Sequence, residues 1–234
     1  MPQSNTESEK PEFAEKVVLD VDHVWQLDPE HEIAEDERKR ICAIACMKMV
    51  IDFVVPEQGK QLSLHTMYEE MKASGARNSK LYWRHPDQVD YFKSLGLTSW
   101  RRNWHAPSND PKWFAENEHY NTDQLVAVSS QMSNEQRFSK GQLRGQFLYS
   151  LRSSFAKDMP VIASVRADMS GRPSEETNHQ VVLCGYEKYQ AGGRIFFVDP
   201  ILAPEDHKDQ QSISVEDFFK ASNYLAIFVE KPAS

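Results

Sequence analysis

The sequence predicts an α+β fold, with a helical N-terminal half packed on an antiparallel sheet in the C-terminal half. Apolar residues recur at helical spacing in several segments before residue 100, whereas short, nearly continuous apolar runs typical of buried strands follow after residue 160. Two of those runs are joined by a segment containing Gly192 and Gly193, as expected for a tight antiparallel reversal. Helices first and strands later are the pattern of an α+β domain.

Composition limits the class of protein. The chain has 234 residues and a net charge of −8, which argues against nucleic acid as the main partner because phosphate binding needs a positive face. No apolar run reaches the roughly 18 residues of a membrane span, and the polar N-terminus lacks the apolar core of a signal peptide. Three cysteines are a low, odd count that favours a reducing compartment. We therefore expect a cytoplasmic protein with no nucleic-acid and no membrane partner.

The N-terminal elements are predicted in order as follows. Residues 1–15 are polar and indicate a disordered tail. Residues 16–27 alternate apolar and polar side chains, as a strand does. In residues 41–55 two adjacent rows of apolar residues recur every four positions, which predicts a helix buried on much of its surface. Pro56 and Gly59 are expected to end it.

Two further helices and a loop-rich segment are expected next. Residues 62–75 form a helix with Ser63 as a possible N-cap, and residues 85–96 form another with proline near its start. Residues 98–136 carry tryptophans among polar residues and prolines, so we expect a loop-rich segment; its basic-aromatic start is interpreted as an amphipathic strand or loop edge. An amphipathic helix over residues 139–158 follows.

The C-terminal half is predicted to supply the sheet. Strand-like runs cover residues 160–167, 179–189 and 194–201, and the last two are expected to pair as an antiparallel hairpin. Residues 214–222 form a short helix capped by its first serine, and residues 224–231 form the last strand. We expect residues 16–234 to make a single domain.

The hairpin places two chemically active side chains together. His179 begins one strand and Asp199 ends the next, and such ends are neighbours in an antiparallel pair. Packing the helix that carries Cys42 against this edge would bring thiol and imidazole together. A cysteine nucleophile needs a base, a group that orients the base, and oxyanion donors; His179, Asp199 and Gln26 fit these roles. A buried core thiol remains the alternative for Cys42.

The segments "DVDHVWQLD", "ICAIACMKMVIDF", "HQVVLCGYEK" and "IFFVDP" resemble, in order and spacing, the C39-like cysteine peptidases, a branch of the papain-like group. The resemblance covers most of residues 17–200 and implies a papain-like fold. It also implies Cys42 as nucleophile, His179 as base, Asp199 as orienting residue and Gln26 as oxyanion donor, with the backbone N–H of Cys42 as a second donor.

The chain departs from the family pattern beside the cysteine. The family usually has Asp before it and Gly-Pro after it, whereas this chain has Ile41, Ala43 and Ile44. The dipole of a helix favours a thiolate only if the helix begins near Cys42 rather than near Ala34.

The resemblance implies a thiol-dependent peptidase or amidase that acts on a peptide or protein substrate through an acyl-enzyme. A non-catalytic papain-like binding module and a thiol acyl or amide transferase remain alternatives. Neither a cofactor nor a metal is expected, because the histidines are scattered and the CxxxC spacing of Cys42 and Cys46 matches neither the redox nor the usual zinc pairs. Cys46 and Cys184 are expected in the core.

Overall fold

The computed structural model describes residues 13–78, 82–104, 140–165, 169, 179–188, 192–206 and 211–231. Most of the predicted tail (residues 1–15) and most of the segment predicted to be loop-rich (residues 98–136) lie outside these residues.

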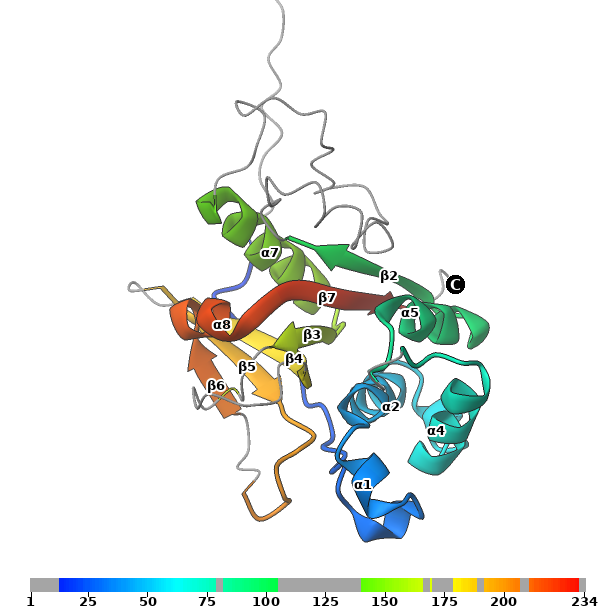
Figure 1. The fold of residues 1–234 in the computed structure, drawn as a ribbon. Helices are drawn as coiled ribbons and strands as arrows, with labels where there is room; N and C mark the ends of the chain where they lie inside the picture. The colour runs from blue at the N-terminus through cyan, green and yellow to red at the C-terminus, as the bar shows by residue number, and fades with distance from the viewer. Residues whose placement is uncertain are drawn as a thin grey trace, which may run out of the picture.

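A seven-stranded antiparallel sheet forms the centre of the described structure (Figure 1). Its strand order is β2-β7-β3-β4-β5-β6, and β1 pairs with β4. The strands are β1 Lys16–Val18, β2 Thr98–Asn103, β3 Val161–Val165, β4 His179–Glu187, β5 Arg194–Val198, β6 Gln211–Ser214 and β7 Ser222–Glu230. The predicted hairpin of β4 and β5 is confirmed, since the two strands pair antiparallel.

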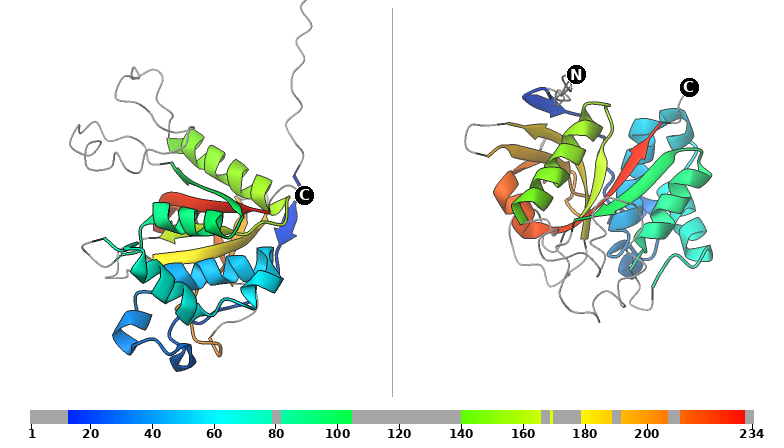
Figure 2. Two further views of the ribbon diagram at one scale, coloured as in Figure 1. Left: turned by 90° about the vertical axis from the view of Figure 1, so that its right-hand side faces the viewer. Right: turned by 90° about the horizontal axis from the view of Figure 1, so that it is seen from above.

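Helices cover both faces of this sheet. They are α1 Glu35–Arg38, α2 Cys42–Val54, α3 Pro56–Gly59, α4 Leu64–Ala73, α5 His85–Ser94, α7 Lys140–Phe155 and α8 Val215–Ala221, with a 3-10 turn at Pro29–His31. Figure 2 shows α7 on one side of the sheet and α2 on the other. The arrangement is α+β and is consistent with a papain-like fold.

Helix α2 is the centre of the helical half. All of its side chains are buried except those of Cys42, Lys48, Asp52 and Phe53. Burying each large aliphatic side chain stabilises the fold by about 1.5–3 kcal/mol, so α2 holds the helical half against the sheet. Lys48 pairs with Asp52 one turn away and donates to the Gly59 carbonyl at 3.3 Å, which ties α2 to α3. Cys42, the first residue of α2, is therefore carried by a rigid element.

Side-chain caps fix two helix starts as predicted. The Ser63 hydroxyl accepts a hydrogen bond from the Thr66 N–H at 3.0 Å, and the Ser214 hydroxyl accepts one from the Asp217 N–H at 3.0 Å. Each satisfies one of the backbone donors that a helix start leaves without an intrahelical partner.

Three elements differ from the sequence-based expectation. The predicted strand over residues 16–27 is paired only over β1, because after Leu19 donates to the Cys184 carbonyl the chain leaves β4. α2 ends at Val54, just before Pro56 as predicted, but Pro56 also begins the short helix α3, which was not predicted, since proline fits the first turn of a helix. Residues 98–103, at the start of the segment expected to be rich in loops, form β2 beside β7, which is the amphipathic strand suggested by their pattern.

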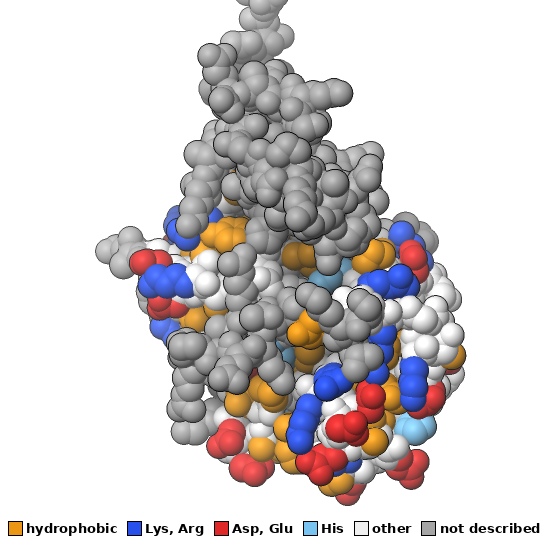
Figure 3. All heavy atoms as spheres, in the orientation of Figure 1, with side chains coloured by type: hydrophobic (Ala, Val, Ile, Leu, Met, Phe, Trp, Pro, Cys, Tyr) orange, Lys and Arg blue, Asp and Glu red, His pale blue; other side chains and the backbone are white. Residues whose placement is uncertain are grey.

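Charged side chains of both signs are interspersed on the helical half of the molecule (Figure 3). Several form local pairs along α5, such as Arg84, just before the helix, with Asp87 at 2.7 Å, and Lys93 with Asp90 at 3.8 Å. Exposed pairs of this kind contribute little to stability. Within the described residues, no helix is long and apolar enough to cross a membrane.

Candidate active site

Cys42 is the first residue of α2, and α1 ends at Arg38, so one continuous helix does not run through the thiol. Ile41, before it, has φ −104° and ψ 18° and offers no capping side chain. The first hydrogen bond of the helix runs from the Ala45 N–H to the Ile41 carbonyl at 2.9 Å. The preceding N–H groups therefore point out of the helix start, where the positive end of the dipole also lies.

The departures beside Cys42 are core residues here. Ile41, Ala43 and Ile44 are all buried, the first and last completely. Cys42 itself is only partly buried, so its sulfur stands at the boundary between this apolar core and the surface. The alternative interpretation of Cys42, a thiol buried in the core, therefore does not fit its position.

His179 and Asp199 meet where the hairpin argument places them. His179 is the first residue of β4, and Asp199 directly follows β5. The imidazole Nε2 lies 2.6 Å from Asp199 Oδ1, which also accepts a hydrogen bond from the Ile201 N–H at 3.1 Å. The two side chains are only 9% and 3% exposed, so the carboxylate fixes the orientation of the ring in a region with little water.

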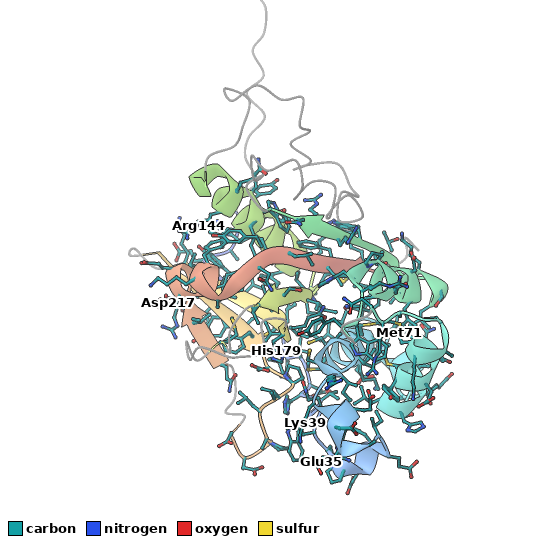
Figure 4. All side chains as sticks on the ribbon, viewed as in Figure 1. Glu35, Lys39, Met71, Arg144, His179 and Asp217 are labelled. Carbon is teal, nitrogen blue, oxygen red and sulfur yellow. The ribbon has the colours of Figure 1, made fainter. Side chains whose placement is uncertain are left out.

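The thiol of Cys42 lies close enough to the ring of His179 to raise the pKa of the imidazole. Since Nε2 faces Asp199, Nδ1 is the ring nitrogen left for the sulfur. Burial alone would lower the pKa of His179, but the hydrogen bond to Asp199, the nearby Cys42 and the negative charge of the carboxylate raise that pKa above its ordinary value. Figure 4 shows His179 where the sheet meets α2.

The other two cysteines lie in the core. Cys46 is completely buried, and desolvation, followed by the nearby Cys42 and Asp199, raises the pKa of its thiol well above the ordinary value. Burial likewise raises the pKa of Cys184 to about 12. Both thiols are therefore protonated and shielded at neutral pH, whereas Cys42 is only partly buried.

Gln26 links the two sides of the site. Its backbone N–H donates to the Pro200 carbonyl at 2.8 Å, and its side-chain Nε2 donates to the Arg38 carbonyl at 3.0 Å. The side chain is 1% exposed. One of its two amide protons is committed to Arg38, which leaves the second for another acceptor.

His23 is a neighbour of the site that the sequence analysis did not single out. Its Nε2 lies 3.1 Å from the Asp199 carbonyl oxygen, so it contacts the same turn as the backbone of Gln26. The signal in the sequence was its position three residues before Gln26, but nothing in the pattern showed that this segment would meet Asp199.

Among the described residues, no group of three or more His, Cys, Asp or Glu side chains could hold a metal ion. The chemistry available to the described site is that of a thiol, an imidazole, a carboxylate and amide donors.

Comparison with known proteins agrees with this architecture. No curated protein sequence matches the chain. The model of the Peptidase_C39 like family, however, matches residues 18–228, which include the strand-borne histidine, the helix-borne cysteine and the aspartate turn. Because the match spans most of the sequence, the chain belongs to the Peptidase_C39 like family, an assignment that supports a papain-like cysteine peptidase or amidase in general.

Proposed function

We propose that this protein is a thiol-dependent peptidase or amidase that cleaves a peptide or protein substrate through an acyl-enzyme. The observation that carries the proposal is the placement of a partly buried thiol, Cys42, beside the imidazole of His179, which is itself hydrogen-bonded to the buried carboxylate of Asp199. A nucleophile, a base and an orienting carboxylate in sequence are the elements that a cysteine hydrolase requires.

In the proposed reaction, the Cys42 thiolate attacks the carbonyl carbon of the scissile amide, and His179 carries the proton. The tetrahedral oxyanion is stabilised by the N–H of Cys42 at the start of α2 and by the remaining amide proton of Gln26. When the C–N bond breaks, His179 gives its proton to the leaving amine. His179 then takes a proton from water, which attacks the thioester and releases the acid and the thiol.

The electrostatics of the site support these roles for His179 and Asp199. A histidine whose pKa is raised by a carboxylate and a thiolate stays protonated beside the thiolate at neutral pH, which stabilises the nucleophilic form of the sulfur. Asp199 accepts two hydrogen bonds and does not itself need to move a proton.

The test is the rate at which iodoacetamide alkylates Cys42 between pH 5 and 9, read by peptide mass spectrometry. We expect fast labelling near pH 6 in the wild type and slow labelling in His179→Ala, because the imidazolium that stabilises the thiolate is then missing. Cys46 and Cys184 serve as internal controls in the same samples, since burial keeps both thiols protonated. Slow labelling that ignores residue 179 would instead favour a binding module without catalysis.

Hydrolysis is then tested directly with a mixture of peptides of randomised sequence. Wild-type protein should cleave and Cys42→Ala should not. Products carrying an added primary amine in place of water would indicate an acyl transferase that uses the same thioester.

A further inference from the structure

A cluster of buried polar side chains lies beside the candidate site and has no part in the proposed chemistry. His85, the first residue of α5, places Nε2 at 2.6 Å from Ser164 Oγ and at 3.0 Å from Gln180 Nε2. Ser164 in β3 and Gln180 in β4 are paired residues and therefore lie side by side on one face of the sheet. They are 6% and 5% exposed, whereas His85 is only partly buried and connects the cluster to the surface.

Two links hold this polar cluster next to the reacting groups. Gln180 directly follows His179 in β4. On the opposite side, Trp83, two residues before His85, donates its indole N–H to the Arg40 carbonyl at 2.8 Å, and Arg40 lies two residues before Cys42. The cluster therefore includes the strand that carries the imidazole, and its histidine lies two residues from a tryptophan bonded to the segment just before the thiol.

One hydrogen-bond acceptor of the cluster has no partner among the described residues. Gln180 Oε1 is buried and has no hydrogen-bond partner among the residues that the structure describes. An unsatisfied buried acceptor is costly, and such groups in native proteins call for a missing partner. A substrate side chain with a donor would supply it.

The charges near the cluster limit which substrate side chain could donate a hydrogen bond to Gln180 Oε1. Burial and the positive charge of Arg101 lower the pKa of His85 to about 4, so the imidazole is neutral at physiological pH. A second cation brought beside Arg101 would be repelled, and a carboxylate would face the open oxygen of Gln180. An uncharged amide side chain avoids both problems, and because it has a donor and an acceptor it complements either end of the Gln180 amide.

We propose that His85, Ser164 and Gln180 form a specificity site that selects an uncharged polar substrate side chain, preferably the amide of Gln or Asn, within two residues of the scissile bond. The inference rests on the proposed peptidase function and adds a substrate class to it. Sites that hydrogen-bond a substrate group discriminate strongly against analogues lacking that group, because the partners in the site are then left unpaired.

The experiment digests a peptide mixture, randomised at every position around the cleaved bond, and reads the products by mass spectrometry. We expect Gln and Asn to be enriched at one position, and kcat/KM for a synthetic Gln peptide to exceed that of its Leu counterpart by about 10- to 100-fold. Gln180→Leu should abolish this ratio. Gln88→Leu is the matched control, because Gln88 is an equally buried glutamine in α5 without a hydrogen bond to the cluster.

The outcomes separate the two proposals. Cleavage without a preference for amide side chains, or with a preference that survives in Gln180→Leu, overturns the specificity site and leaves the peptidase proposal intact. If Gln180→Leu fails to fold, Ser164→Ala takes its place and must lower the Gln-to-Leu ratio several-fold. Absence of any cleavage by the wild-type protein overturns the peptidase proposal and the specificity site with it.

Discussion

Replacing Asp199 by asparagine tests the electrostatics of the site through protein stability. In the wild type the Nε2–Oδ1 pair of His179 and Asp199 is 2.6 Å long and nine-tenths or more buried at both side chains. Removing one partner of a buried charged pair costs about 3–5 kcal/mol, because the other charge is left uncompensated. Asp199→Asn also weakens the acceptor for the Ile201 N–H.

The pH dependence of that loss follows from the direction of the His179 pKa. The folded-state pKa is raised above the unfolded value of about 6.5, so the stabilisation is fully present below pH 6.5 and is lost as pH rises through the folded pKa. In Asp199→Asn the dominant effect left on the ring is burial, which lowers its pKa. The difference in unfolding free energy should therefore be about 3–5 kcal/mol at pH 5.5 and shrink to the ~1 kcal/mol of a neutral hydrogen bond at alkaline pH.

The assay is urea unfolding followed by tryptophan fluorescence at pH 5.5, 7 and 9. Asp90→Asn is the control, because Asp90 forms an exposed pair with Lys93 at 3.8 Å whose loss should cost less than about 1 kcal/mol at every pH. A destabilisation by Asp199→Asn that is constant with pH, or that grows toward alkaline pH, would refute the reasoning.

Two further predictions concern positioning and packing. His23→Phe removes the contact with the Asp199 carbonyl but keeps a ring, and should lower kcat about tenfold with little change in KM, measured on a peptide that the wild type cleaves; equal loss in KM would show a binding role instead. Gly185→Ala should lower the free energy of unfolding by about 1–3 kcal/mol in urea titrations, because its Cβ would lie 2.5 Å from the Val17 carbonyl oxygen. Gly145→Ala, in open space on α7, should instead raise it by about 0.5–1 kcal/mol, so a similar loss in both variants would contradict the packing argument.

Much of the fold follows from the sequence because its signals are local. The four-residue apolar repeat predicts α2, the serine caps mark α4 and α8, and the two glycines after β4 predict its pairing with β5. That pairing is also why the meeting of His179 and Asp199 could be anticipated. Their catalytic roles, and that of Cys42, remain predictions.

Other features depend on partners that no local pattern reveals. Alternation over residues 16–27 indicates one buried and one exposed side, and Leu19 and Val21 are indeed buried. The same alternation cannot show where backbone pairing with β4 ends. β6 is short and polar, so it has no apolar pattern to detect. The contact of His85 with Ser164 joins residues 79 positions apart, and neither lies in a recognisable motif.

The order of the site residues along the chain has a consequence for biosynthesis. Cys42 leaves the ribosome well before His179 and Asp199 have been translated, so the nascent polypeptide holds this thiol without the imidazole that it later lies beside. The thiol and the imidazole can meet only after β4 and β5 have emerged and packed against α2. Synthesis therefore delays the meeting of thiol and imidazole until both strands have been made, and the alkylation rate at residue 42 would report when α2 and the sheet have come together.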